Sequence, residues 1–511
     1  MKTKTKRQIE RHRRRIERRL DKRNLDGGAE PMITAGNLQF EIADRTCATA
    51  AGGVGAVHLV ARKLGLAEEI DRRLNLFKIH LPYHESDHVL NIAYNLLAGG
   101  TCLESLELRR HDRAYLDALG ARRLPDPTTA GDFCRRFQAE HVLELMEVFN
   151  DARVKVWRQQ PESFFDEAVV DVDGTMATTT GGCKAGMDIN YKGEWGYHPL
   201  LVSLANTGEP LDIVNRPGNR PSHEGAGDHL DRAFALCRRA GFRKIAVRGD
   251  TDFSQTERLD GWHDAGVQFV FGLDATERRY ELAENLPESE WTELQRRAKH
   301  EVETQPRRRP PNVKEKIVVD RGFKNIQLVC EHVSEFNYQP VKCRRPYRVV
   351  VLWKSLTVTE GQHELFDDAK AFLYITNDFE SSAEAIVFRA NGRCDQENLI
   401  QQLKQGVRAL TAPVDNLTSN WAYMAMAALA WSLKAWAALL LPAKGPWKAK
   451  RAEEKRKLLR MDFATFCDAF IRMPAQILRA GRRLICRLLS WNPWQHVFFR
   501  LLDQLQTPLR L

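Results

Sequence analysis

At residue 164 the sequence changes from helical periodicity to short runs of β-branched and apolar residues. The segment FFDEAVVDVDGT is a β-branched, apolar run that ends in turn residues, which predicts a buried strand. YHPLLVSLAN and EPLDIVNRPGN predict two further strands, joined at the Thr-Gly turn between them. GAGDHLDRAFALCRRAGF then predicts an amphipathic helix with a glycine near its C-terminal end, and KIAVRGD and VQFVFGLD predict two more strands. Strands interrupted by a helix in this order predict an α/β domain.

The length of the chain requires more than this one domain. A chain of 511 residues is too long for a single compact core, so several structural units are expected. The predicted segments are a basic arm and linker (1–54), a helical region (55–160), the first half of the α/β core (161–274), a β-rich insertion (275–370), the second half of the core (371–443) and a basic helical C-terminal region (444–511).

The region before the core has helical periodicity and helical punctuation. GAVHLVARKLGL, DHVLNIAYNLLAGG and HVLELMEVFNDARVKVW each predict a helix, and PDPTTAGDF predicts an N-cap. Several short helices of this kind form either a helix-turn-helix type DNA-binding unit or a plain helical support. The sequence favours neither alternative.

The insertion and the segments after it contain both helix and strand patterns. ERRYELAENLPESEWTELQRRAK predicts a charged helix, PRRRPP a basic loop, and KIVVD, IQLVCEHV and YRVVVLW predict strands. FLYITND returns to the core as a strand, and EAIVFRANGRCDQENLIQQLKQGVRAL predicts one long helix. In the tail, KRAEEKRKLLRMDF and AQILRAGRRLICRLLSW predict helices.

The formal net charge of +10 is unevenly placed. Residues 2–23 form a basic run with only three acids, Glu10, Glu17 and Asp21. Such a run is typical of an arm that binds a polyanion, usually nucleic acid. The alternative is a solvated or frayed helix that keeps the protein soluble.

Cysteine usage and apolar segments indicate the compartment. The ten cysteines include no CxxC pair, which favours a reduced, cytosolic chain without a zinc site. The basic N-terminus lacks the apolar core of a signal peptide, so export is not indicated. Residues 421–441 are apolar over about the length of a membrane-spanning helix. Lys434 lies well inside this segment, alanine dominates it and no second span exists, so a buried core helix is predicted instead.

Three carboxylates stand out by their position. Asp173 lies at the end of the strand DVDGT, on the same face as Asp171, and Asp250 lies just beyond the strand KIAVR. Strand ends in an open sheet are where ligand sites are normally built. Glu397 lies within the long predicted helix, on the face that also presents Arg393 and, two turns on, Lys404.

Taken in order, these motifs resemble those of bacterial DDE transposases, specifically the group 1 DDE branch with an inserted β domain. DVDGT resembles the first motif of that family, VRGDTDFS the second, and NGRCDQENLIQQLK the third, a Tyr-x2-Arg-x3-Glu-x6-Lys signature. Arg393, Glu397 and Lys404 fill three places of the signature, and Ala390 occupies the tyrosine place. A lost tyrosine would remove a phosphate or backbone contact, for which neighbouring polar groups could substitute. The resemblance spans about residues 40 to 490, and the strand order resembles the opening half of a ribonuclease-H-like domain.

The resemblance implies phosphodiester chemistry with two Mg²⁺ ions, or Mn²⁺ in their place, held roughly 4 Å apart. Mg²⁺ prefers carboxylate oxygens and keeps several waters, so three acids suffice to hold the pair. Asp173 would bridge both ions, Asp250 would hold one and Glu397 the other. Arg393 and Lys404 would bind phosphates of the strand that is cut.

Each of the three ligands has a neighbouring rival; in chain order the rivals are Asp171, Asp252 and Asp395. The DGT that begins at Asp173 favours this residue as the first ligand. Phe253, in the place of the second motif's aromatic residue, favours Asp250. The Arg-x3-Glu spacing favours Glu397, for which the plain alternative is a surface salt bridge to Arg393.

Aromatic residues near the insertion add a further hypothesis. Related cut-and-paste transposases use an aromatic side chain of the inserted domain to stack on a flipped base. Phe372 and Trp353 are the candidates for this DNA contact, and the alternative for each is a core position. His198 and His223 lie near the first motif and are given no role.

The sequence therefore predicts an α/β protein with a ribonuclease-H-like catalytic core, a β-rich insertion, a helical N-terminal DNA-binding region and a helical C-terminal tail. It would be a cytoplasmic, nucleoid-associated DNA transposase that binds the terminal inverted repeats of its insertion sequence as a homodimer, without a membrane. It would cut both ends and join them to target DNA. Its rivals are a regulator derived from a transposase whose catalysis has lapsed, a general nuclease or ribonuclease H, and a membrane-associated protein.

Overall fold

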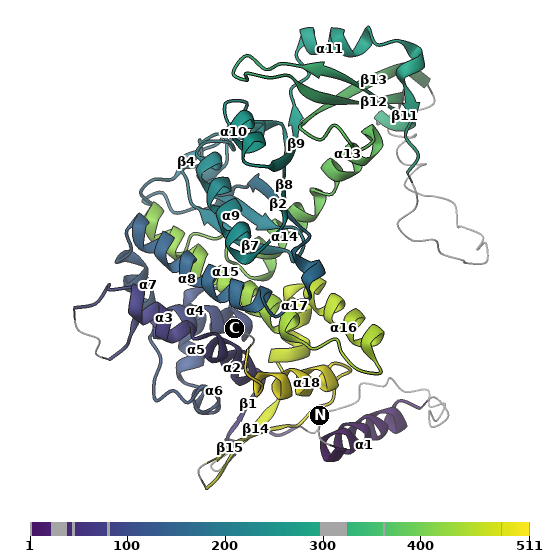
Figure 1. Ribbon diagram of the computed structural model, residues 1–511. Helices are drawn as coiled ribbons and strands as arrows, with labels where there is room; N and C mark the ends of the chain where they lie inside the picture. Colours follow the sequence, from purple (N-terminus) through teal and green to yellow (C-terminus); the bar gives the residue numbers. More distant parts are fainter. Residues whose placement is uncertain are drawn as a thin grey trace. The chain divides into compact units, whose positions relative to one another are not determined.

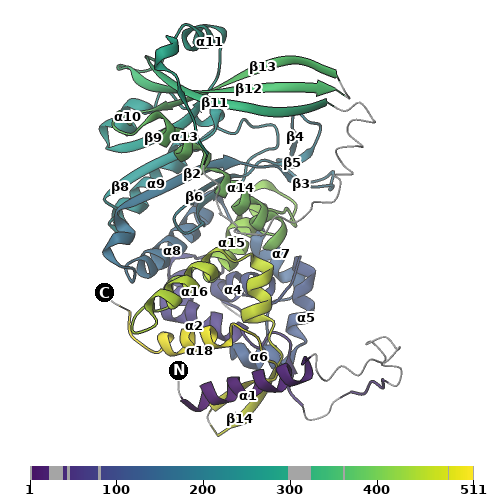
Figure 2. The ribbon, with the colours of Figure 1, turned by 90° about the vertical axis from the view of Figure 1, so that its right-hand side faces the viewer.

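The computed structural model describes residues 3–21, 38–42, 46–78, 82–296, 324–360, 363–481 and 483–509, without the side chains of 324–327, 358–360 and 363–368. It divides into two compact units. The first, called here the helical unit, contains Met1–Phe164, Gly174–Arg220 and Glu397–Leu511. The second, the sheet unit, contains Phe165–Asp173 and Pro221–Gln396. Figures 1 and 2 show the elements of both units from two directions.

The sheet unit is built on a mixed sheet with the strand order β10-β11-β12-β13-β9-β8-β2. The central strands β2, β8 and β9 are parallel, and β13, β12, β11 and β10 add antiparallel strands beyond β9. The strand bounds are β2 (Glu167–Gly174), β8 (Lys244–Gly249), β9 (Val267–Leu273), β10 (Thr292–Glu293), β11 (Lys324–Tyr338), β12 (Tyr347–Glu360) and β13 (His363–Thr376).

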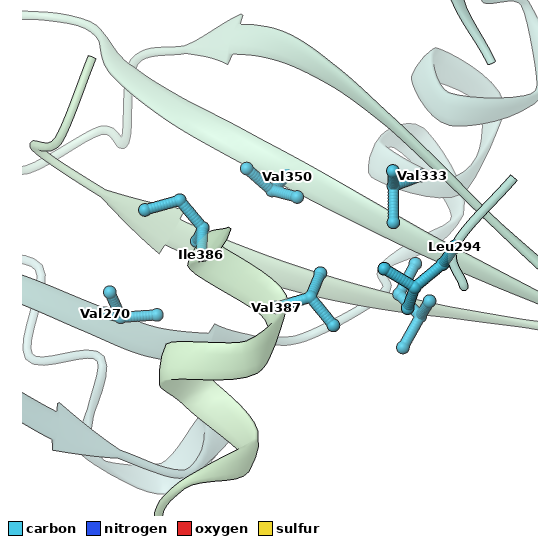
Figure 3. Close-up of a cluster of buried hydrophobic side chains, with 7 residues drawn as sticks. Val270, Leu294, Val333, Val350, Ile386 and Val387 are labelled. Carbon is cyan, nitrogen blue, oxygen red and sulfur yellow. The ribbon is translucent and has the colours of Figure 1, made fainter. Parts of the chain in front are cut away.

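The helices of the sheet unit are α9 (Ala226–Ala240), α10 (Leu259–Asp264), α11 (Glu277–Glu284) and α13 (Ala383–Asn391). Helix α9 ends at Gly241, whose φ of 105° is the left-handed conformation that glycine adopts without strain. Helix α13 packs on β9 and on the antiparallel strands. Figure 3 shows the buried cluster between them, made by Val270, Leu294, Val333, Val350, Leu352, Ile386 and Val387.

The strands and the helix predicted for residues 164–274 are confirmed, including the turn at Gly208 between the second and third strands. The insertion differs from the expected arrangement in one respect. Its long strands continue the sheet of the core, and the boundary predicted between residues 370 and 371 falls inside β13. The predicted strand KIVVD and the loop PRRRPP lie outside the described residues.

Two predicted helices in this half of the chain are shorter than expected. The charged segment after residue 276 forms only α11, which ends at Glu284 because Pro287 cannot continue a helix, and Thr292–Glu293 then pair with β11. The long helix predicted around the third motif is also interrupted. It consists of α13, a turn at Gly392 and Arg393, α14 (Cys394–Gln401) and a π-helical turn at Gln402–Gly406.

The helical unit contains the helices predicted before the core, together with small sheets. Its helices are α1 (Thr3–Arg19), α2 (Val54–Leu64), α3 (Leu66–Arg73), α4 (Glu85–Leu97), α5 (Leu106–Arg110), α6 (Arg113–Leu119), α7 (Pro127–Arg135), α8 (Ala139–Trp157), α15 (Leu417–Leu440), α16 (Lys448–Arg460), α17 (Phe463–Phe466) and α18 (Gln495–Leu505). Its strands are β6 (Leu200–Leu204) paired with β7 (Glu209–Val214), the sheet β3-β5-β4 (Ala177–Thr178, Trp195–Tyr197, Asp188–Ile189) and the sheet β1-β14-β15 (Ala48–Thr49, Ala475–Ala480, Arg483–Leu488).

Helix α15 is the centre of the helical unit. It packs against α2, α4, α7, α8 and α16 and against strand β7 (Figure 1). Among the described residues it is the helix long and apolar enough to cross a membrane, and its apolar window is entirely buried within the structure. The predicted buried helix at 421–441 is therefore confirmed.

The predicted helix AQILRAGRRLICRLLSW is wrong. This segment forms the antiparallel hairpin β14–β15, with Gly481 at a φ of 59° in its turn. In β14, buried and more exposed residues alternate over Ala475–Leu478, which is the period of a strand, and β14 also pairs with β1. The C-terminal region is consequently a mixture of helices and a small sheet. The ten cysteines are all free thiols.

Candidate active site

Asp171 and Arg248 form a buried ion pair across two neighbouring parallel strands. Asp171 on β2 lies opposite Arg248 on β8, and only 1% of its side chain is exposed. Its two carboxylate oxygens accept hydrogen bonds from Nε and Nη2 of Arg248, each at 2.7 Å. Burial raises the pKa of Asp171, and the hydrogen bonds and charge of Arg248 oppose this rise. Both oxygens therefore have a partner within the fold, which makes Asp171 a poor candidate for a metal ligand.

Asp173 and Asp250 lie beyond this pair, at the carboxyl ends of the same two strands. Asp173 is near the end of β2 and is partly exposed, at 16%. Asp250 directly follows β8 and caps the short turn Thr251–Phe253, with its side chain accepting from the backbone N–H of Asp252 at 3.1 Å. Because parallel neighbouring strands end at the same edge of a sheet, their carboxyl ends bring the two acids together.

The guanidinium of Arg393 contacts both carboxylates. Its Nη1 lies 3.2 Å from Oδ2 of Asp173 and 3.9 Å from Oδ2 of Asp250. Burial raises the pKa of Asp250, the charge of Arg393 lowers it, and the neighbouring Asp252 raises it. One cation thus lies between two acids. This arrangement is attractive to positive charge, and its oxygen-only donor set suits a hard divalent ion such as Mg²⁺.

The interruption of the predicted helix positions Arg393. Nη1 of Arg248 donates to the backbone carbonyl of Arg389 at 3.0 Å, at the end of α13. A Cβ added to Gly392 would lie 2.2 Å from that same nitrogen. An alanine here would require the guanidinium of Arg248 to shift, and the turn formed at Gly392 carries Arg393 to the two aspartates.

Ala390, at the tyrosine place of the signature, packs against the buried cluster of Figure 3 together with Tyr374. Tyr374 lies opposite Gly272 of β9, and a Cβ added to Gly272 would lie 2.7 Å from the backbone nitrogen of Thr251, the residue after Asp250. The side chain of Tyr374 leaves the sheet on this same face. Burial raises the pKa of its phenol, while the charges of Arg296 and Arg393 lower it. Tyr374 could not be identified from the sequence, because only the strand register places it opposite Gly272.

Lys404 lies in the helical unit, in the π-helical turn after α14. Its Nζ donates to Oγ1 of Thr175 at 3.2 Å, and Thr175 follows the DVDG of the first motif. Burial lowers the pKa of Lys404, and the nearby carboxylate of Glu194 opposes this effect. The predicted lysine therefore contacts the last residue of the first motif.

Glu397 lies in α14, one helical turn along the chain from Arg393, and the boundary between the two units falls directly before it. Glu397 and its rival Asp395 are both exposed. Within the described residues, a compact three-ligand grouping occurs elsewhere, at Asp71, His84 and Glu85. These carboxylates accept hydrogen bonds from local backbone groups, which is a structural role.

The two aromatic candidates lie on neighbouring strands but on opposite faces of the sheet. Phe372 pairs with Leu352, and Trp353 pairs with Ala371, so their side chains point in opposite directions. Phe372 is 42% exposed, with Nζ of Lys354 5.0 Å from its ring centroid. Trp353 is half-buried, with ring centroids 5.5 Å from Tyr280 and 5.8 Å from Trp291. The two side chains therefore cannot serve one base-binding site.

Comparison with known proteins places the chain in a family. No curated protein matches it in sequence. Among solved structures, a similar one is the cryo-EM structure of a piggyBac transposase synaptic complex with hairpin DNA, with a TM-score of 0.35, 11% sequence identity, and coverage of 84% of this chain and 83% of that chain. The family model described as transposase DDE domain group 1 matches residues 44–509, which is nearly the whole chain. The chain therefore belongs to the transposase DDE domain group 1 family.

Proposed function

We propose that this protein is a DNA transposase that binds the terminal inverted repeats of its insertion sequence, hydrolyses phosphodiester bonds at the ends and joins the ends to target DNA by transesterification. Family membership supports DNA transposition in general. The observation that carries the cleavage step is the position of Asp173 and Asp250 at adjoining strand ends with the guanidinium of Arg393 between them. The parallel run β2-β8-β9 supports a ribonuclease-H-like core.

The proposed ligands of two Mg²⁺ ions, or of Mn²⁺, are Asp173, Asp250 and Glu397. When bound, the ions would lower the pKa of the attacking water or 3′-hydroxyl and neutralise the leaving oxygen. Arg393 has a distinct task in this proposal. Once cations neutralise the two aspartates, its guanidinium would pair with a phosphate of the strand that is cut. Lys404, held at Thr175, would bind a second phosphate.

Solvent exposure decides which elements we propose as contacts to DNA. Helix α4 is buried along nearly its whole length, so it supports the fold and cannot enter a groove of DNA. Helix α1 has no buried residue and carries most of the basic arm, which suits contact with phosphates. Phe372 remains the better of the two aromatic candidates for stacking on a base, because its ring is exposed. A homodimer on paired ends and a cytoplasmic, nucleoid-associated location complete the proposal.

The proposal is tested by cleavage of a labelled duplex that carries the element's own end, with Mg²⁺ or Mn²⁺. The native chain should cut at the end, and Glu397→Gln should lose at least about 100-fold in rate, because a ligand of the reacting centre is lost. Asp395→Asn is the matched control, since it removes another exposed carboxylate from the same helix. Its rate should stay within about threefold of the native rate. Equal rates for native protein and Glu397→Gln would refute the assignment.

The second candidate is a regulator derived from a transposase whose catalysis has lapsed. The observation that favours it is Ala390 at the signature tyrosine, where its methyl group packs against the hydrophobic cluster. Specific binding of the end without metal-dependent cutting would support this candidate. Cutting of any DNA regardless of sequence would instead indicate a general nuclease.

A further inference from the structure

Helix α6 and the hairpin β14–β15 form a hollow in the helical unit that arginines line. The cavity has a volume of about 590 Å³, and its lining includes Arg113, Arg122, Arg479 and Arg483. We call it the arginine groove. The side chains of all four arginines are exposed to solvent. They come from two segments more than 350 residues apart along the sequence, so the groove could not be predicted from the sequence.

The arginine groove carries an excess of positive charge. Asp117 is its one acidic lining residue, and its Oδ1 accepts from Nη2 of Arg479 at 2.7 Å. Within the part of the chain that the structure describes, no ion pair engages Arg113, Arg122 or Arg483. Four guanidinium groups thus face one carboxylate. Like charges gathered around one hollow repel one another, and a bound anion would relieve this repulsion.

We propose that the arginine groove, whose lining contains none of the residues proposed to cut DNA, binds the phosphate backbone of duplex DNA. The inference rests on the proposed function, which supplies duplex DNA as the polyanion. Guanidinium groups match phosphate oxygens in charge and in the geometry of their donors, and exposed arginines can reach a backbone that a rigid fold approaches. None of the proposed metal ligands lines the groove, so the groove is a separate contact. It would add affinity without reading sequence.

The test is a salt titration of binding, measured by fluorescence anisotropy of a labelled duplex with the element's end. Replacing the four groove arginines by glutamine should weaken binding at least tenfold, by an order-of-magnitude estimate for removing cations that pair with phosphates. It should also flatten the plot of log affinity against log salt by up to about 0.9 for each phosphate that the groove no longer neutralises. The four side chains are exposed, and loss of the surface ion pair of Arg479 with Asp117 costs little, so the thermal unfolding midpoint should change little.

The control removes four charges elsewhere in the same unit, by glutamine substitutions at Arg72, Arg456, Lys457 and Arg460, which are exposed. This variant should keep most of the salt slope. A second groove variant with four lysines should keep the slope as well, because each lysine still contacts a phosphate as a point charge. An equal loss of slope in the groove and control variants would overturn the proposal, since bulk charge would then explain the binding.

A cleavage assay distinguishes failure of the groove proposal from failure of the proposed function. At saturating DNA the groove variant should cut the end at the native rate, because the groove lies outside the cutting residues. A native protein that binds DNA with the predicted salt slope but never cuts it would refute the transposase mechanism and leave the groove supported. A groove variant that binds as the native protein does would refute the groove alone.

Discussion

At the scale of single residues, two aspartates on one strand differ in their surroundings. Asp171 is buried against Arg248, and Asp173, two positions later, is partly exposed at the strand end. The alternation of a strand was enough to predict that both share one face. It could not predict which acid has a structural partner, because Arg248 comes from a strand 77 residues later whose register the sequence does not specify.

Replacing Arg248 alone should destabilise the protein more than replacing both Arg248 and Asp171. Arg248→Met leaves the carboxylate of Asp171 buried without compensation, and should lower the free energy of unfolding by about 3–5 kcal/mol. The double variant Arg248→Met with Asp171→Leu should recover much of this loss, because no charge then remains buried. Urea unfolding of the three proteins provides the comparison, and a double variant no more stable than the single one would contradict the ion-pair account.

Ala390 illustrates a residue whose departure from a family pattern has a packing reason. Its methyl group meets the cluster that Val270 and Val387 help to form, beside Tyr374. Restoring the signature with Ala390→Tyr should overpack this region and destabilise the protein by about 1–3 kcal/mol. Thermal unfolding would show it. A more stable Ala390→Tyr protein would mean that space for the phenol exists and that the alanine has no packing role.

At the scale of elements, long apolar patterns predicted their structures well and boundaries poorly. The apolar content of α15 predicted a buried helix, and the β-branched runs predicted β2, β8 and β9. The third motif looked like one helix because nothing in its periodicity reveals the contact of Gly392 with Arg248. The hairpin β14–β15 was mistaken for a helix because its arginines and leucines also fit a helical period, and pairing with β1 is a tertiary effect.

The turn between α13 and α14 should be sensitive to a single methyl group. Gly392→Ala improves intrinsic helix propensity, yet its Cβ would lie 2.2 Å from Nη1 of Arg248. We expect a decrease of about 1–3 kcal/mol in the free energy of unfolding, because the guanidinium must move from its hydrogen bonds. If the Gly392→Ala variant were more stable than the native protein in urea, propensity would outweigh the clash.

Helix α15 should make stability depend on pH through Lys434. This side chain is buried, with Nζ 3.8 Å from the ring centroid of Trp431 and donating to the carbonyl of Leu459 at 2.9 Å. Burial lowers its pKa to about 7, against an ordinary value of 10.5 in the unfolded chain. Between these two pKa values the unfolded chain binds more protons than the folded chain. The contribution of Lys434 to the free energy of unfolding is therefore greatest above the upper value and is lost as the pH falls towards 7.

Lys434→Met should therefore remove a pH dependence of up to about 1.4 kcal/mol per pH unit across this window. The measurement is the free energy of urea unfolding at several pH values above 7, compared with the native protein. Lys457→Met, which changes an exposed lysine of α16, should leave the dependence intact. Identical slopes for native protein and Lys434→Met would contradict the account of a buried lysine.

At the scale of the whole molecule, the chain order of strands and the three motifs were enough to predict an α/β transposase, and the family match supports that prediction. The sequence could not show that segments as distant as α6 and β14–β15 build one surface, or that the insertion lengthens the core sheet. Those features depend on tertiary pairing. We expect paired ends to bind a homodimer, and mass photometry of the protein with end DNA should show two chains per complex; a monomer on paired ends would contradict this.

If Asp173 and its partners hold the metal ions that cut DNA, exchanging one ligand atom should change which ion supports cutting. Asp173→Cys should fail to cut an end duplex with Mg²⁺, which thiolate binds poorly, and should regain activity with Mn²⁺ or another softer ion. Asp252→Cys should cut normally with Mg²⁺. Recovery of Asp173→Cys with the softer ion alone is the predicted result. Full activity of Asp173→Cys with Mg²⁺ would contradict this role of Asp173. So would an Asp173→Cys protein that is inactive with every ion, if Asp250→Asn still cuts.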